Sequence, residues 1–268
     1  MFGEVFVSQC RSHLATVRIA AFGPLAEGLW AAFSLTLRFV RVLILLAIWP
    51  TLIPPGTAVS GYRLGAVLTY SLIAEVLSAQ LGARTRMSAA LWNGAIATRF
   101  TWPMPMATLY AAEMVGEWAL PALLVSLPLL LLAPVLGVDP RPASAANLGA
   151  FALSLGLAIA VGVAIDMAYT VLTVRIDLGP WVLNAVRAVI QAICSGAWVP
   201  LALLPFQLGA VFDWLPFASA ASAPLRIYTG TGDPLPLLAL QAAWLVVLAV
   251  AVRAAWHVSR ERVALYGG

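Results

Sequence analysis

Residues 195–230 read SGAWVPLALLPFQLGAVFDWLPFASAASAPLRIYTG. The stretch is apolar enough for a membrane interior, but prolines at positions 200, 205, 216 and 224 prevent one uninterrupted helix. Broken apolar backbone at membrane depth is tolerated only where protein or a water-filled cavity covers it. The stretch therefore predicts a helix that reaches the far side of a membrane, a short re-entrant hairpin over residues 205–233, and a return span. This arrangement is more typical of a transport protein than of a passive anchor.

The composition of the 268-residue chain is that of a polytopic membrane protein. Hydrophobic residues make up 62% of it and charged residues only 10%, whereas a soluble domain carries about a quarter charged residues. No polar block is long enough to form a separate soluble domain. We therefore expect a single transmembrane domain over residues 1–268.

Six segments are long and apolar enough to cross a bilayer, which takes about 20 residues in a helix. The sequence therefore predicts an all-α fold with six transmembrane helices over residues 34–53, 62–82, 107–133, 147–173, 185–204 and 235–256. A tight polar turn at 53–61 and a proline-rich loop at 137–147 separate neighbouring spans. A longer amphipathic loop, residues 84–106, follows the second span.

The distribution of arginine predicts the orientation of the chain. With the N-terminus inside, twelve arginines lie on or near the cytoplasmic side, and only Arg63, Arg141 and Arg226 lie outside. Such a bias is a strong positive-inside signal. We therefore expect both termini in the cytoplasm and the re-entrant hairpin on the outer side.

Residues 1–33 form a cytoplasmic or interfacial segment before the first span. Within it, residues 4–22 carry scattered arginines among apolar residues and can form an amphipathic helix in the membrane interface. A flexible basic tail held by anionic lipid is an equally good interpretation. The first 22 residues contain no compact apolar core with a cleavage site, so a removable signal peptide is not expected.

The chain contains no lysine, because all fifteen basic residues are arginine. A Walker A loop needs a lysine for the β- and γ-phosphates, and a pyridoxal-phosphate enzyme needs one for its Schiff base. Any ATP and Mg²⁺ used with this chain must therefore bind to a partner subunit. The two histidines, His13 and His257, lie in cytoplasmic flanks. We expect no catalytic, cofactor-binding or metal site in this chain.

Four carboxylates lie inside the predicted spans, in the cytoplasmic half of the membrane: Glu75, Glu113, Glu117 and Asp166. A bare carboxylate is costly in lipid, so these side chains must face protein or water. Arg38 and Arg41, at the inner end of the first span, are the expected partners. The six residues form either an ion-pair network that locks the helices together or an inward-facing vestibule or gate, acidic enough to favour cationic amphiphiles. The sequence does not separate these two interpretations.

The loop after the second span contains MSAALWNGAIATRF, residues 87–100, with arginines at both ends. A short helix here can present Leu91, Ala95 and Thr98 on one face and dock into a groove on a partner protein. Alternatively, the segment is an interfacial helix resting on lipid headgroups. The Trp92-Asn93-Gly94 sequence equally favours a break between two shorter pieces.

Three stretches resemble the membrane subunit of a type 2 ABC exporter, an ABC-2 permease, of the compact six-span bacterial group. LWNGAIATRFTWPMP (91–105) resembles the family's cytoplasmic segment, in which a glycine is followed by a basic or polar residue and a proline. SGAWVPLALLP (195–205) resembles the segment that leaves the membrane after the fifth span. FDWLPFASAASAPLRIYTG (212–230) resembles the outer hairpin, with its Leu-Pro-Phe, later proline and aromatic-x-Gly ending.

The resemblance implies two permease chains, identical or paralogous, acting on two nucleotide-binding ATPase subunits that hold ATP and Mg²⁺. The loop at 84–106 would transmit the ATPase motion through Met87, Leu91, Trp92, Asn93, Gly94, Thr98, Arg99 and Phe100. The outer hairpin would form an extracellular lid that includes Pro205, Leu215, Pro216, Phe217, Pro224 and Gly230. Because the loop lacks acidic residues, its grip on the ATPase is expected to rest on apolar contacts and arginine.

We therefore expect a permease subunit of an ATP-driven exporter in the bacterial cytoplasmic (inner) membrane, which moves a hydrophobic or amphipathic small molecule or lipid outward. It would be a transport subunit without its own ATPase activity, in contact with the lipid bilayer and not with nucleic acid. The main alternative is a proton-coupled secondary transporter with the intramembrane carboxylates as its relay, although such carriers usually show clearer inverted repeats. A third class is a non-transporting scaffold in a membrane complex.

Overall fold

The computed structural model describes residues 2–23, 28–99, 102, 105–176 and 178–266, with side chains between residues 11 and 258 except Ala97. Almost all regular structure in this part of the chain is helical. The exception is an antiparallel hairpin of two short strands, β1 (Ala58–Val59) and β2 (Tyr62–Arg63). Ser60 and Gly61 between them both have positive φ, which gives a tight turn whose twist suits a hairpin. The polar turn expected at 53–61 is therefore a small β-hairpin, and the fold is not purely helical.

Four helical segments in the described residues are long and apolar enough to cross a membrane. They are α2 (Leu29–Leu52), the continuous α7–η2–α8 segment (Met106–Leu132), α9 (Ala145–Ile176) and α13 (Pro234–Tyr266). Two apolar helices are shorter, α3 (Leu64–Val76) and α10 (Pro180–Cys194). Each of the six overlaps one of the segments expected to span, but the number of spans stays a prediction.

The second and fifth expected spans are shorter than the sequence predicted. After α3, the short helix α4 (Ser78–Leu81) begins beyond a break at Leu77. The helix α10 ends at Cys194 rather than near residue 204, because Gly196 takes a positive φ of 71° and Pro200 follows. The Tyr70 hydroxyl donates a hydrogen bond of 2.6 Å to the Gly196 carbonyl and holds this turn against α3.

The third expected span contains a local change of helical pitch. The α-helix α7 (Met106–Pro121) passes into a π-helix, η2 (Ala122–Ser126), and then into α8 (Leu127–Leu132). Pro121 cannot donate a backbone hydrogen bond, and a π-bulge is one way in which a helix adapts to such a loss. The segment is therefore continuous but not uniform.

The proline-broken stretch forms a 3₁₀ turn, η3 (Leu201–Leu203), and two helices, α11 (Leu208–Phe212) and α12 (Pro216–Thr229). Pro216 occupies the first turn of α12, where its missing N–H costs nothing, and Gly230 ends the helix with a φ of 68°. The middle of α12 is buried against α3, α9 and α13. The position of this segment relative to a bilayer, and hence its re-entrant character, stays a prediction.

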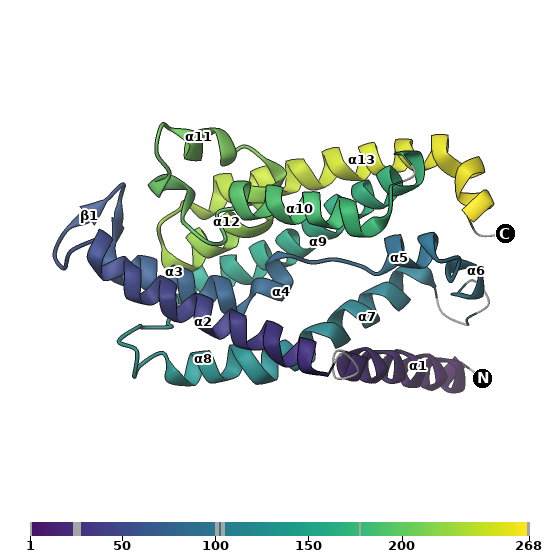
Figure 1. Cartoon of the computed structure of the whole chain (residues 1–268), viewed down its shortest axis with the longest axis horizontal. Helices are drawn as coiled ribbons and strands as arrows, with labels where there is room; N and C mark the ends of the chain where they lie inside the picture. Colours follow the sequence, from purple (N-terminus) through teal and green to yellow (C-terminus); the bar gives the residue numbers. More distant parts are fainter. Residues whose placement is uncertain (1, 24–27, 100–101, 103–104, 177, 267–268) are drawn as a thin grey trace.

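The two ends of the molecule differ in what they carry (Figure 1). The β-hairpin and α11 lie at one end. The start of α1 (Phe2–Phe22), the short helices α5 (Met87–Trp92) and α6 (Ile96–Arg99), and the end of α13 lie at the other. Of the core residues between these ends, Tyr70, Leu72 and Leu225 are almost completely inaccessible. The loop expected to contact an ATPase therefore lies at the same end as both chain termini.

The helix expected over residues 4–22 is present as α1, and it runs beside α7 along the long axis of the molecule (Figure 1). The two helices approach closely at Gly116. A Cβ atom there would lie 2.4 Å from the Val17 carbonyl oxygen and 2.7 Å from the Ala20 Cβ. Only glycine therefore fits at this point without moving α1.

We expect Gly116→Ala to destabilise the protein by about 1–3 kcal/mol, since overpacking forces the backbone to shift. The measurement is the thermal unfolding midpoint of the purified chain in neutral detergent. The control is Gly156→Ala in α9, where a Cβ would meet nothing within 4 Å; this change removes a helical glycine and is not expected to destabilise. Equal midpoints for both variants would contradict the close packing of α1 on α7.

Candidate functional site

The loop at 84–106 contains two short helices rather than one. Gly94 has a φ of 74° and separates α5 from α6. The Asn93 side-chain oxygen accepts a hydrogen bond of 3.1 Å from the Ala95 N–H and so supports the start of α6. The interpretation of Trp92-Asn93-Gly94 as a break is therefore correct, and the single helix with Leu91, Ala95 and Thr98 on one face is wrong.

The break divides the apolar side chains of the loop between two surfaces. Leu91 is 1% exposed and packs with Ile96 against Val174 of α9 and Trp256 of α13. Trp92, the next residue, is 40% exposed, and Asn93 and Thr98 are also exposed. Leu91 therefore belongs to the core of this chain and cannot be a contact for a partner, whereas Trp92 can. Phe100 lies outside the described residues.

A buried ion pair anchors the beginning of the loop. Arg187 of α10 donates a hydrogen bond of 2.5 Å to Asp166 of α9, and both side chains are 3% exposed. The other Asp166 oxygen accepts hydrogen bonds from the Thr85 N–H and hydroxyl, at 2.8 and 2.7 Å. Arg187 also donates to the carbonyls of Ala83 and Gly162. These contacts bind residues 83–85, just before α5, to both α9 and α10.

Two further ion pairs bind the loop to α7. Arg99, at the end of α6, donates a hydrogen bond of 2.9 Å to Glu113, and its guanidinium lies 4.9 Å from the centre of the Tyr110 ring. Arg86 pairs with Glu117. Three of the four intramembrane carboxylates therefore fix the loop to the helices. The expectation that arginine would help to grip the ATPase does not fit these two side chains, because both already have partners within the chain.

The fourth carboxylate, Glu75, is 4% exposed and joins α3 to α2. Arg38 donates to it at 2.7 Å and also contacts Ser78, and Arg41 donates to its second oxygen. The sequence named Arg38 and Arg41 as partners for all four carboxylates, which is wrong for three of them. Arg187 was missed because its position at the start of a span reads as an ordinary cytoplasmic arginine.

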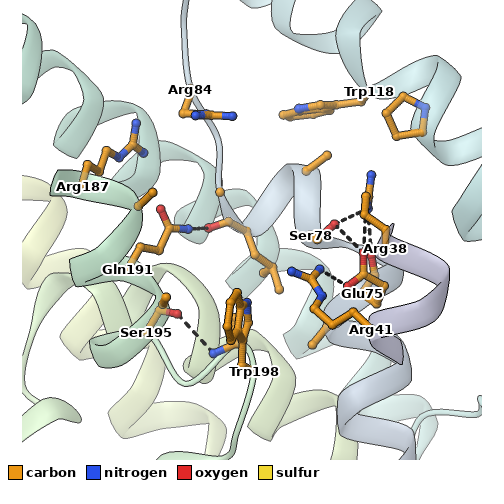
Figure 2. Close-up of a pocket in the computed structure, with 18 of the residues that line it drawn as sticks. Arg38, Arg41, Glu75, Ser78, Arg84, Trp118, Arg187, Gln191, Ser195 and Trp198 are labelled. Carbon is orange, nitrogen blue, oxygen red and sulfur yellow. Dashed lines mark hydrogen bonds and ion pairs between the residues drawn. The ribbon is translucent and has the colours of Figure 1, made fainter. Parts of the chain in front are cut away.

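A cavity of about 470 Å³ lies among α2, α3–α4, α7 and α10. Figure 2 shows the Arg38–Arg41–Glu75 cluster on one side of it and Arg187 with Gln191 on the other. Arg84 extends toward Trp118, and Trp198 lies near Arg41 (Figure 2), whose guanidinium is 5.3 Å from the Trp198 ring centre. The volume of the cavity, about 470 Å³, is in the range of small-molecule sites.

The lining charges of this cavity are more basic than acidic. Four arginines and two glutamates line it: Arg38, Arg41, Arg84, Arg187, Glu75 and Glu117. Glu113 and Asp166 do not line it; they pair with Arg99 and Arg187. The expectation of a vestibule acidic enough to favour cationic amphiphiles is therefore wrong.

In the predicted hairpin, α11 lies at the end of the molecule opposite α5 and α6 (Figure 1), whereas α12 is buried among the other helices. Leu215 and Pro216 begin α12, Pro224 is buried within it, and Gly230 ends it. Phe217 packs beside Val161 and Ile165 of α9, and Pro205 precedes α11. An ion pair of 3.0 Å between Arg226 and Asp213 joins α12 to the end of α11. Within the described part of the chain, no three His, Cys, Asp or Glu side chains gather in a way that could hold a metal ion.

Comparison with known families gives one result that bears on this architecture. The family described as ABC-2 family transporter protein matches residues 36–263. The matched range contains every ion pair described above and all of the helices except α1, the start of α2 and the last residues of α13. No curated protein gives a significant match to the chain.

Proposed function

Since the chain belongs to the ABC-2 family of transporter proteins, we propose that it is the membrane-spanning subunit of an ATP-driven exporter. In this proposal a separate nucleotide-binding subunit hydrolyses ATP, and this chain moves a hydrophobic or amphipathic molecule outward. The chain crosses the bacterial inner membrane six times with both termini in the cytoplasm. It acts beside a second permease chain, identical or paralogous.

The observation that carries this proposal is the way the α5–α6 segment is held. Its inner face packs on α9 and α13 through Leu91 and Ile96. Its two ends are fixed to α7, α9 and α10 by the buried or half-buried ion pairs of Asp166, Glu113 and Glu117. A force applied to the exposed surface around Trp92 would therefore reach α7, α9 and α10 at once. This is what a segment needs in order to transmit the motion of a partner to the membrane helices.

The alternative of a proton-coupled carrier is less well supported. A proton relay needs carboxylates that can release and take up protons within the membrane. Here each of the four intramembrane carboxylates has an arginine within ion-pair distance. In each pair the carboxylate already contacts an arginine, so it is not free to serve as a relay group. The ion pairs instead suit a role in holding helices and loop together.

The proposal is tested with the complex purified through this chain from its native membrane and placed in lipid nanodiscs. We expect it to hydrolyse ATP, with a rate that a protonophore does not change. The carrier alternative is tested with the chain alone in proteoliposomes. Amphiphile uptake that is driven by a pH gradient and abolished by Glu75→Gln, with no ATPase in the complex, would contradict the exporter proposal.

A further inference from the structure

The cavity among α2, α3–α4, α7 and α10 contains more positive charge than its own side chains neutralise. Five arginines and three carboxylates line it or pair with its lining: Arg38, Arg41, Arg84, Arg86, Arg187, Glu75, Glu117 and Asp166. Two positive charges are therefore left over. One arises because two arginines share Glu75, and the other is the charge of Arg84.

Arg84 is the most available of these charges. It is exposed, it lines the cavity, and it makes no ion pair with any other described residue. Its side chain extends toward Trp118 across the cavity (Figure 2). Arg187 adds a second unsatisfied donor in the wall, because its buried Nε has no hydrogen-bond partner in the described part of the chain. An anion entering the cavity would therefore meet the Arg84 guanidinium, whereas the Arg187 Nε is enclosed in the wall.

The remaining lining is apolar and aromatic. Trp118 and Trp198 lie on different sides of the cavity, and Leu45, Pro121 and Ala192 also line it. A basic patch beside apolar surface suits a molecule with a charged head and an apolar body. Arginine is well suited to a phosphate-like head because its planar guanidinium can donate two parallel hydrogen bonds.

We propose that this cavity binds an amphiphile with an anionic, phosphate-like head group, which Arg84 contacts beside the Arg38–Arg41–Glu75 cluster while the apolar part packs against Trp118 and Trp198. The site identifies the substrate class of the exporter, so this inference rests on the proposed function. The surplus of positive charge attracts anions into the cavity and repels cationic amphiphiles.

The test measures ligand binding to the purified full-length chain in neutral detergent by microscale thermophoresis. The probes are a short-chain phosphatidic acid, phosphatidylcholine with the same chains, inorganic phosphate, and an alkyltrimethylammonium. We expect phosphatidic acid to bind more tightly than the other three. We expect Arg84→Gln to weaken its binding about tenfold, as for the loss of one charge-assisted hydrogen bond. We expect Arg84→Lys to weaken it less than Arg84→Gln, because the charge remains but the two parallel donors are lost.

The matched control is Arg253→Gln. Arg253 is an exposed arginine of α13 that does not line the cavity, so its loss is expected to leave phosphatidic acid binding unchanged. Equal binding of the cationic amphiphile, or an unchanged affinity in a folded Arg84→Gln variant, would overturn the proposal. If inorganic phosphate bound as tightly as phosphatidic acid, the cavity would be a site for a free anion. That result would overturn the proposal that its ligand is an amphiphile. Because no ATPase is present, failure here is distinguishable from failure of ATP-driven export.

Discussion

Asp166→Asn is expected to destabilise the protein by about 3–5 kcal/mol, the cost of leaving a buried charge without its partner. The asparagine keeps the size of the side chain but removes the negative charge that faces Arg187 at 2.5 Å. The asparagine amide N–H would also face hydrogen-bond donors instead of acceptors, because Asp166 accepts from both the N–H and the hydroxyl of Thr85. The measurement is chemical unfolding of the purified chain in mixed micelles.

The matched control for this prediction is Asp139→Asn. Asp139 is paired with Arg141 at 3.9 Å, but both side chains are largely exposed, at 72% and 86%. Such surface pairs contribute about 0–1 kcal/mol. The double variant Asp166→Asn with Arg187→Met should recover part of the lost stability, because it no longer contains a buried unpaired charge. A loss below about 1 kcal/mol for Asp166→Asn would show that the pair does not anchor the loop.

Trp92→Ala is expected to weaken the binding of the ATPase subunit at least tenfold. Trp92 is 40% exposed at the end of α5, while its neighbour Leu91 is buried and holds the segment in place. Exposed tryptophans at the centre of an interface commonly contribute 2 kcal/mol or more, which exceeds a factor of ten in affinity. The measurement is the amount of ATPase subunit that co-purifies with the variant at fixed expression.

Trp214→Ala is the control for Trp92→Ala. Trp214 is 71% exposed and lies between α11 and α12, and α11 lies at the end of the molecule opposite α5 and α6 (Figure 1). The same side-chain loss there should leave the ATPase subunit bound. Unchanged co-purification for Trp92→Ala, or an equal loss for both variants, would contradict the assignment of the α5–α6 segment as the coupling surface.

The sequence predicted the long helices well and the interrupted ones poorly. The helices α2, α9 and α13 overlap their expected spans because each is a long apolar run whose prolines, where present, lie only in its first or last turn. The early end of α10 depends on tertiary contact, since the Tyr70 hydroxyl, 126 residues away, holds the Gly196 carbonyl. Hydropathy cannot reveal such a contact.

The ion pairs also show what the sequence alone cannot predict, namely which arginine pairs with each carboxylate. The sequence singled out four carboxylates in apolar segments, because charge is conspicuous there. Their partners lie between 14 and 37 residues away along the chain and on other elements. Arg187 could have been found only from its placement about two turns inside α10, on the side that meets α9. The ion pairs depend on how the helices pack, which the sequence does not show. As a result, the net charge of the cavity lining is positive rather than negative as expected.

Native mass spectrometry of the complex, gently solubilised from its native membrane, tests the proposed role most directly. We predict two permease-sized chains bound to two copies of a soluble polypeptide of ATPase size, and the masses also show whether the permease chains are identical. A stable homo-oligomer without any nucleotide-binding partner would contradict the exporter proposal.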